Sequence, residues 1–340
     1  EASSVRARIL EYGKLFEELH VIIYTKKGTG HQAPGTRIAD NVFLYPTNSR
    51  LKLLYFRDAY RLAKSLVTSR RLSVITSQDP FETGFVAWLL KKKFNLPWQA
   101  QVHTDFLSPY FRKSSLKHLL RSLFGVWLIR KADRIRVVSN KIKDSISAVN
   151  PRLSERITVL PIFVDWQVFA REKRNEQLAE KYKPNGEFLI LTVSRREEEK
   201  NLNLASEIVE GLSDRGNKVR WILVGSGSQK NIPNATEGAG APIHFYKIAD
   251  LFLLTSNYEG YGMAAVEAAA AGVPVVMTDV GVAIGETFPG GAKDRAVSII
   301  EGLIQDPEKR KLLVERQNEF FKNWPTKEQY LDQYRESLTF

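Results

Sequence analysis

Short runs of apolar, strand-favouring residues alternate with longer amphipathic stretches along most of the chain. A run of about four to eight such residues is typical of a buried strand, whereas apolar residues spaced three and four apart indicate a helix. Strands that alternate with helices in this way predict βαβ units and parallel sheets. The strands are expected at 21–25, 42–45, 73–76, 99–103, 134–139 and 157–161, and then at 188–194, 219–225, 251–256 and 273–279.

The alternation of strands and helices is interrupted between 166 and 186, where the sequence is polar and has no clear strand. We therefore predict an α/β protein with two Rossmann-like domains facing across a cleft, where ligands would bind beyond the carboxyl ends of the strands. The domains are expected at 1–166 and 167–325, followed by a C-terminal helix at 326–340 for which Thr326 is a suitable N-cap. Helices of the first half are expected at 3–18, 56–70, 81–93, 112–131 and 141–148.

Charge is distributed unevenly between the two halves of the 340 residues. Residues 1–165 carry 28 lysines and arginines against 13 acidic residues, a net charge of +15, whereas residues 166–340 carry 22 against 25, a net charge of −3. The basic half indicates an anionic partner, although solubility charge is the alternative. The absence of cysteine excludes disulfides, thiolate zinc sites and a cysteine nucleophile. We expect no secretory signal and no membrane-spanning segment.

The stretch NYEGYGMAAVEAAAAGVPVVMTDVG, residues 257–281, follows one of the predicted strands. A glycine loop leads into a helix, and the free N–H groups of such a helix start form an anion site. Gly262 has no side chain to obstruct a phosphate. Glu259 and Glu267 can then face one bound ligand. Alternatively, Glu259 only complements the helix dipole and Glu267 is a solvated helix residue.

Two other strand ends repeat this pattern. In LTVSRREEEKN, residues 191–201, Arg195 and Lys200 follow a strand and are suited to neutralising a diphosphate, or they pair with the intervening glutamates. In ILVGSGSQ, residues 222–229, Gly225 begins a turn that resembles a loose nucleotide-binding turn, which is a weak signal by itself. We include Gly225 among the candidate donor-binding residues.

These segments together resemble the nucleotide-sugar half of the retaining GT-B glycosyltransferases of the glycogen-synthase-like, "glycosyl transferases group 1" kind. The resemblance is carried by SRREEEKN, LVGSGS and ADLFLLTSNYEGYGMAAVEAAAAGVPVV, and the last of these contains the family's Glu-x7-Glu motif at Glu259 and Glu267. VLPIFVD, ADRIRVVSNKIKD and QVHTDF resemble segments of the first half. The resemblance implies a GT-B fold whose C-terminal helix crosses back to the N-terminal domain.

The resemblance also implies roles for the matching residues. Arg195 and Lys200 would bind the donor diphosphate and stabilise the departing nucleotide diphosphate. Backbone N–H groups near Gly262, Met263 and Ala264 would hold the same phosphates.

The remaining implied roles concern the sugars. Glu267 would hold the ribose hydroxyls, Glu259 would contact the transferred sugar, and His103 would lie across the cleft near the reacting centre. By itself, a lone histidine after a strand is more often structural. We predict His103, Glu259, Arg195 and Lys200 as the catalytic set.

The implied reaction is the retaining transfer of a sugar from a nucleotide-diphosphate sugar to a hydroxyl of a glycan or lipid-linked glycan. No dedicated protein nucleophile is needed in this family, so the paired carboxylates of glycoside hydrolases are the wrong template. We expect no cofactor and no metal, because the chain has no Asp-x-Asp and no histidine cluster. The alternatives are a nucleotide-sugar 2-epimerase and a catalytically silent membrane- or polymer-binding relative.

The segment 112–131 is the strongest candidate for an additional partner. Its apolar residues lie at helical spacing and are flanked by basic residues, which is typical either of a helix packed on its sheet or of one lying on an anionic membrane. We expect a cytoplasmic protein, peripheral on the inner membrane face, and no nucleic-acid partner. The apolar residues are Leu116, Leu119, Leu120, Leu123, Phe124, Trp127 and Leu128.

Three segments depart from the family pattern. The first strand and its glycine loop are expected to be absent before the helix at 3–18. The helix and strand usually found between GSGSQ and IADLF have only about twenty residues available, and the short strand after GVAIGETF is expected to be shortened as well.

Overall fold

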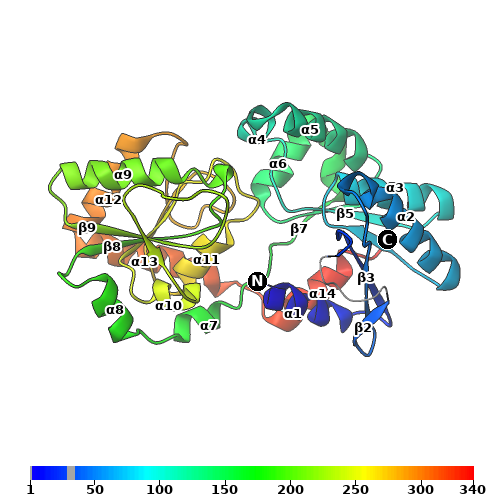
Figure 1. The fold of residues 1–340 in the computed structure, drawn as a ribbon, viewed down its shortest axis with the longest axis horizontal. Helices are drawn as coiled ribbons and strands as arrows, with labels where there is room; N and C mark the ends of the chain where they lie inside the picture. The colour runs from blue at the N-terminus through cyan, green and yellow to red at the C-terminus, as the bar shows by residue number, and fades with distance from the viewer. Residues whose placement is uncertain (1, 29–34) are drawn as a thin grey trace.

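The computed structural model describes residues 2–28 and 35–340, which form two α/β domains (Figure 1). The N-terminal domain contains two sheets. In the first, of order β1-β3-β2, the strands are β1 (Leu19–Ile23), β2 (Thr36–Ala39) and β3 (Val42–Pro46), and β2 runs antiparallel to β3. In the second, of order β4-β5-β6-β7, all are parallel: β4 (Ile75–Ser77), β5 (Trp98–Val102), β6 (Arg134–Val137) and β7 (Ile157–Val159).

Helices surround these two sheets. They are α1 (Ala2–Gly13), η1 (Lys52–Leu54), α2 (Tyr55–Ser69), α3 (Glu82–Phe94), α4 (Pro109–Ser114), α5 (Leu116–Ile129), α6 (Asn140–Val149) and η2 (Pro151–Arg156).

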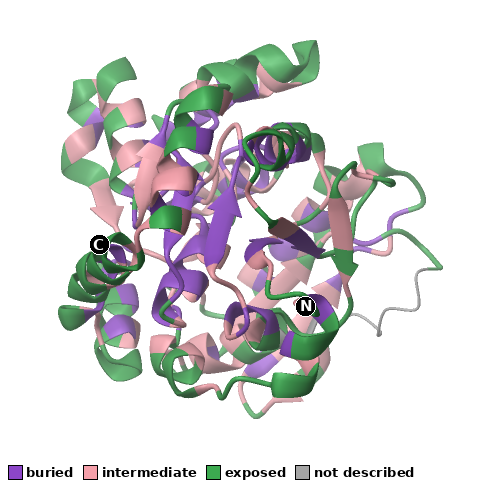
Figure 2. Cartoon of the chain, turned by 90° about the vertical axis from the view of Figure 1, so that its left-hand side faces the viewer, coloured by how far each residue is buried: buried purple, intermediate pink, exposed green. Residues whose placement is uncertain are grey.

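The C-terminal domain is built on one parallel sheet of six strands, in the order β10-β9-β8-β11-β12-β13. Its central strands are buried on both faces, as Figure 2 shows, which explains why they read as continuous apolar runs in the sequence. The strands are β8 (Phe188–Val193), β9 (Val219–Val224), β10 (Ala235–Gly238), β11 (Leu251–Leu254), β12 (Val275–Thr278) and β13 (Glu286–Phe288).

Helices cover both faces of this sheet, and the last one returns to the N-terminal domain, where α14 lies beside α1 (Figure 1). This crossing confirms the expected GT-B arrangement. The helices are α7 (Trp166–Arg171), α8 (Glu176–Tyr182), η3 (Glu198–Lys200), α9 (Leu202–Asp214), α10 (Pro242–Tyr246), α11 (Met263–Ala270), α12 (Lys293–Gln305), α13 (Pro307–Lys322) and α14 (Lys327–Glu336).

The structure corrects several sequence-based boundaries. The single helix predicted at 112–131 is two helices, α4 and α5, because Ser115 is extended and caps α5 with its side chain. The short interval before β11 still contains both a strand, β10, and a helix, α10, and β13 supplies the strand expected to be shortened. The predicted domain boundaries at 166, 167 and 325 remain predictions.

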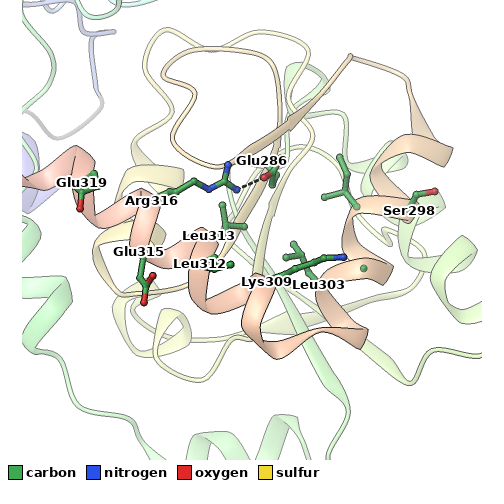
Figure 3. Close-up of a pocket in the computed structure, with 11 residues that line it drawn as sticks. Glu286, Ser298, Leu303, Lys309, Leu312, Leu313, Glu315, Arg316 and Glu319 are labelled. Atoms are coloured by element: carbon green, nitrogen blue, oxygen red, sulfur yellow. Dashed lines mark hydrogen bonds and ion pairs between the residues drawn. The ribbon is translucent and has the colours of Figure 1, made fainter.

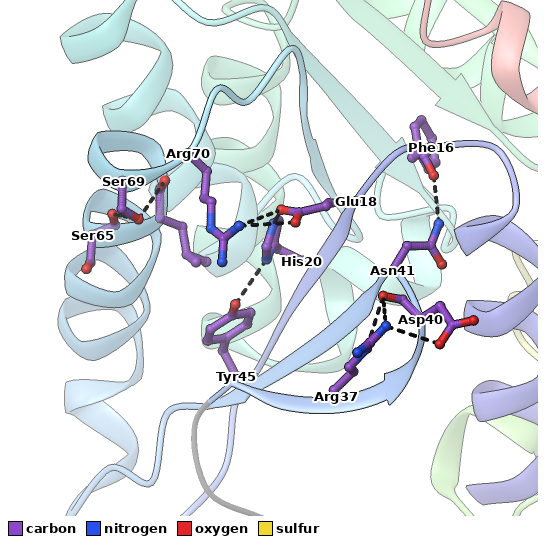
Figure 4. Close-up of polar contacts among 11 residues, drawn as sticks. Phe16, Glu18, His20, Arg37, Asp40, Asn41, Tyr45, Ser65, Ser69 and Arg70 are labelled. Atoms are coloured by element: carbon purple, nitrogen blue, oxygen red, sulfur yellow. Dashed lines mark hydrogen bonds and ion pairs between the residues drawn. The ribbon is translucent and has the colours of Figure 1, made fainter.

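The helix predicted at 3–18 ends earlier, at Gly13. The Asn41 side chain donates hydrogen bonds to the carbonyl oxygens of Gly13 and Phe16, which satisfies two acceptors at the turn that follows α1. Figure 4 shows the bond to Phe16. Nearby, His20 on β1 bonds to the Tyr45 hydroxyl on β3 at 3.0 Å. These contacts tie the first helix to the small sheet.

A buried arginine attaches α14 to the sheet of the N-terminal domain. Arg136 on β6 is 1% exposed. Its guanidinium donates to the side chain of Gln101, to the hydroxyl of Tyr330 and to the carbonyl oxygens of Leu160 and Pro161. Since all these partners are neutral, the cation is held by oriented dipoles rather than by an ion pair.

The capping of α14 completes its attachment. Thr326 accepts a hydrogen bond from the Gln329 backbone, and the Gln329 side chain accepts one from the Thr326 backbone, so the predicted N-cap is confirmed as a capping box. Further along α14, Tyr334 stacks on Tyr12 of α1 with ring centroids 4.2 Å apart.

Replacing Arg136 with methionine should lower the free energy of unfolding by about 3 kcal/mol, because several buried acceptors lose their donor at once. Urea unfolding measures this difference. The matched control is Arg335→Met, since Arg335 lies on α14 in an exposed ion pair with Asp332 and should change stability by less than about 0.5 kcal/mol. Equal effects of the two changes would contradict the role assigned to Arg136.

Candidate functional site

The loops after β8, β9 and β11 meet at the carboxyl edge of the six-stranded sheet. Gly225 follows β9 at φ +139°, and a Cβ there would lie 2.0 Å from the Ser194 carbonyl oxygen after β8. A residue with a side chain could not occupy this position without moving the backbone. Gly225 therefore allows two strand-end loops to pack directly together.

Lys200 and Glu259 form an ion pair at this edge. The Lys200 ammonium lies 2.5 Å from Oε1 of Glu259, and the two side chains are only 13% and 14% exposed. Ser256, just after β11, donates a hydrogen bond to the same carboxylate oxygen at 2.7 Å. Two of the predicted catalytic residues are thus brought together from positions 59 residues apart.

The two loops that carry this pair are fastened to each other. Thr255 donates from its hydroxyl to the carbonyl oxygens of Lys200 and Asn201, and Asn201 donates from its side chain to Asn257. The Asn257 backbone donates in turn to the Glu199 carbonyl. Sequence reasoning missed these residues, although Thr255, Ser256 and Asn257 are the polar residues directly after a buried strand.

Helix α11 begins beside Glu259. Its N-cap, Gly262, has φ +89° and no side chain to bond the first turn, and no atom lies within 4 Å of where a Cβ would stand. The first N–H groups of a helix have no partner within the helix, so those of Met263 and Ala264 are available to an anion. This start of α11 has the open geometry that the sequence predicted.

Gly260 brings the other domain to this edge. A Cβ on Gly260 would lie 1.8 Å from the His103 carbonyl oxygen and 3.2 Å from the Thr104 nitrogen. The backbone after β11 therefore lies directly against the backbone after β5. The His103 backbone is therefore next to Gly260, the residue after Glu259, and the role predicted for its side chain stays a prediction.

The environment of His103 keeps its ring neutral. Burial is the main cause that lowers the pKa of His103 to about 3, and the positive charges of Arg136 and Arg8 lower it further. The ring nitrogen Nε2 is shielded from solvent and has no hydrogen-bond partner among the described residues. His103 can accept or donate a hydrogen bond there, but it does not carry a charge near neutral pH.

Two further contacts connect the domains around this point. Phe111 of α4 meets Tyr258 edge to face, with centroids 5.5 Å apart. Lys141 of α6 forms an ion pair with Asp279 after β12. Together with the Gly260 contact, these interactions hold the loop that contains Glu259 against the N-terminal domain.

Two predicted site residues have partners outside the Lys200–Glu259 pair. Arg195 is 63% exposed and pairs with Glu199 at 2.9 Å. Glu267 accepts a hydrogen bond from Tyr246 of α10, and burial raises its pKa while that bond lowers it. The structure thus places Glu267 on the same helix as the anion site but with a different partner from Glu259.

A cavity in the described part of the chain lies away from this edge. It measures about 650 Å³ and lies between α12 and α13, next to the first residue of β13, so it is at the opposite edge of the sheet (Figure 3). Leu303, Leu312 and Leu313 line it, and an ion pair between Arg316 and Glu286 crosses one side. No predicted site residue faces it.

Among residues 2–28 and 35–340, no group of three or more metal-ligating side chains is placed to hold an ion. Within the same described residues, no helix combines the length and the apolar composition needed to cross a membrane.

Two protein-family models match the chain. Residues 173–337 match the family described as "Glycosyl transferases group 1", and residues 10–167 match "Glycosyltransferase Family 4". The two matches are consecutive and together cover both domains. The chain therefore belongs to the glycosyltransferases, and the group 1 model covers its second half. The predicted family is therefore confirmed at this level.

The chain is similar to several known proteins. An alpha-monoglucosyldiacylglycerol synthase of Streptococcus pneumoniae is 25% identical over 286 residues, or 74% of the chain; the match spans 64% of that relative, just under two thirds of its length. The sucrose-phosphate synthase of Thermosynechococcus elongatus has a TM-score of 0.77 at 17% identity, covering 98% of the chain and 92% of that structure. Anabaena HepE, solved in complex with UDP-glucose, has a TM-score of 0.70 at 18% identity, covering 94% and 99%. These likenesses confirm the GT-B fold.

Gly260→Ala should force the two backbones apart. We expect a loss of about 1–3 kcal/mol in the free energy of unfolding and a larger radius of gyration, because the added methyl overlaps a carbonyl of the other domain. Chemical unfolding and small-angle X-ray scattering measure the two quantities. Gly302→Ala is the control: it lies in α12 with open space around it and should be neutral or stabilising by up to about 1 kcal/mol. Unchanged stability and radius for Gly260→Ala would contradict the contact.

His103 should make the protein sensitive to mild acid. Because its folded pKa lies below the ordinary value near 6.5, the unfolded chain binds more protons, and this part of the stability is lost as pH falls from about 6.5 towards 3. The His103→Gln variant lacks this titrating group. When pH falls from 7 to 5, its free energy of unfolding should therefore rise by about 2 kcal/mol relative to that of the wild type. Urea unfolding at both values measures it. The difference in free energy of unfolding between variant and wild type should not change between pH 7 and pH 8. If it also stayed constant down to pH 5, the low pKa of His103 would be refuted.

Proposed function

We propose that the chain is a retaining glycosyltransferase that takes its sugar from a nucleotide-diphosphate sugar. The observation that carries this proposal is the largely buried Lys200–Glu259 pair beside the open start of α11, next to the point where the Gly260 backbone meets that of His103 from the other domain. A cation and free backbone N–H groups suit a diphosphate, and a carboxylate suits sugar hydroxyls. The complex of Anabaena HepE with UDP-glucose supports the donor class.

In the proposed reaction, the bond between the sugar C1 and the β-phosphate oxygen breaks while the acceptor oxygen bonds to C1 on the same face. The acceptor proton passes to a phosphate oxygen of the leaving diphosphate. Lys200 and the N–H groups of Met263 and Ala264 stabilise the negative charge that develops there. Glu259 holds hydroxyls of the transferred sugar, and Glu267 those of the ribose.

His103 acts in this scheme as a neutral hydrogen-bonding group. With its low pKa it cannot serve as a cationic acid near neutral pH, so it orients the sugar rather than protonating the leaving group. Arg195 joins the diphosphate by leaving Glu199, which its exposed position permits. The cations and the helix start can together carry the charge of the leaving group, which supports metal-independent transfer.

We propose a glycan or a lipid-linked glycan as the acceptor. The similarity to an alpha-monoglucosyldiacylglycerol synthase over 74% of the chain supports an acceptor with a lipid portion. A nucleotide-sugar 2-epimerase on the same fold, or a catalytically silent relative, would lack transfer to any hydroxyl. Mass spectrometry after incubation with UDP- and GDP-sugars and a glycolipid mixture distinguishes these outcomes: a new glycoside supports the transferase, and an epimerised sugar alone opposes it.

Lys200→Ala should reduce kcat/KM about a hundredfold, because the charge of the leaving diphosphate loses its principal partner. Steady-state kinetics with the accepted donor measures the loss, and activity should be unchanged by a metal chelator. Arg215→Ala is the control, since Arg215 also forms an ion pair in this domain, with Glu301, but lies just after α9, away from the strand ends. A Lys200→Ala variant that is folded and as active as Arg215→Ala would remove Lys200 from the site.

A further inference from the structure

Helix α5 shows apolar side chains on two different faces. Ser122, Gly125, Leu128 and Ile129 are buried against the rest of the domain. A second row, which the sequence pattern merged with the first, points outward: Leu116, Leu120, Leu123, Phe124 and Trp127, of which Leu116 is 72% exposed. Their spacing of three and four residues makes one continuous stripe on the solvent side of the helix.

The stripe continues onto three neighbouring elements, α3, α2 and η1. Phe85 of α3 contacts Phe124, with ring centroids 5.8 Å apart, and also contacts Phe56 at the start of α2 at 6.4 Å. Just before α2, in η1, Leu53 is 81% exposed. Trp88 of α3 meets Trp127 edge to face at 5.1 Å. We call the outward row of α5 together with Phe56 and Leu53 the apolar face.

Basic residues surround the apolar face. Arg112 and Lys113 are exposed at the end of α4, Lys117 is exposed at the start of α5, and no acidic residue occurs between 106 and 132. Lys92 and Lys131 place their ammonium groups 5.9 and 5.8 Å from the ring centres of Trp88 and Trp127. The stems of such lysines cover apolar surface while their charges stay at its edge.

Nearby acidic groups do not cancel this charge. Glu82 at the start of α3 pairs with Arg121, and Asp58 of α2 pairs with Arg57. A second copy of the chain docked symmetrically on this face would bring the same lysines opposite each other, which repels. The charge therefore favours an anionic partner over self-association.

We propose that the apolar face docks on an anionic lipid bilayer, with the leucines and aromatic rings in the interface and the lysines on the headgroups. The surface extends the expected membrane segment 112–131 to η1, α2 and α3. Phe111 of α4 stacks on His118 of α5 and meets Tyr258 beside Glu259, so α5 lies near the proposed site and a lipid-anchored acceptor in the same bilayer would reach it. Docking itself does not depend on the proposed function.

Sedimentation with vesicles tests the proposal on the full chain without any donor. We expect binding to phosphatidylcholine mixed with phosphatidylglycerol, weaker binding at high salt, and little binding to phosphatidylcholine alone. Lys113→Glu with Lys117→Glu should weaken it by roughly tenfold or more, and Leu120→Ser by roughly threefold or more.

Two matched controls separate the face from general effects. Leu312→Ser changes a leucine of α13 with the same 57% exposure as Leu120, and Lys218→Glu with Lys311→Glu reverses the same charge on the other domain. Both controls should bind vesicles within about twofold of the wild type. Equal loss in controls and test variants overturns the proposal. Binding that is equally strong to charged and uncharged vesicles would also overturn it. So would self-association in the absence of lipid that Leu120→Ser abolishes.

Discussion

The close approach of the Gly260 and His103 backbones is the constraint on which the proposed site depends. With no side chain between them, the loop after β11 and the loop after β5 lie in direct contact, so Glu259 is held at the junction of two domains rather than on the surface of one. Phe111 on Tyr258 and Lys141 on Asp279 support the same junction from its sides. The position of the candidate site therefore follows from how closely two main chains can approach.

Most of the fold follows from the periodicity of the sequence because buried parallel strands are continuous apolar runs. The start of α14 was predictable because Thr326 is a favourable N-cap residue. The periodicity of a sequence does not show which strands pair with one another. Strands β2, β10 and β13 are short and lie at sheet edges, where neighbours rather than their own residues decide the conformation. Ser115 breaks a helical pattern that continues on both sides of it, so the break was not predictable.

The candidate site was likewise predictable from the sequence only in part. The residue types at the strand ends and the glycine at the start of α11 were predictable from the sequence. The partners were not, because Lys200 with Glu259 and Glu267 with Tyr246 depend on the relative placement of elements far apart in the chain. The two faces of α5 show a further limit, since the spacing of leucines and aromatic residues is identical whether a row is buried or exposed. Only the tertiary contacts of Ser122 and Leu128 decide which row faces the core.

Charge connects these features. Lys200 is balanced by Glu259, but the described partners of the buried Arg136 guanidinium are all neutral, so a fixed positive charge remains behind the junction. That charge acts on His103, whose ring stays neutral partly because of it. A doubly charged diphosphate arriving at α11 would meet this potential in a region where solvent screening is weak. Arg136 therefore has two effects. It attaches α14 to the N-terminal domain, and its positive charge favours an anionic ligand between the two domains.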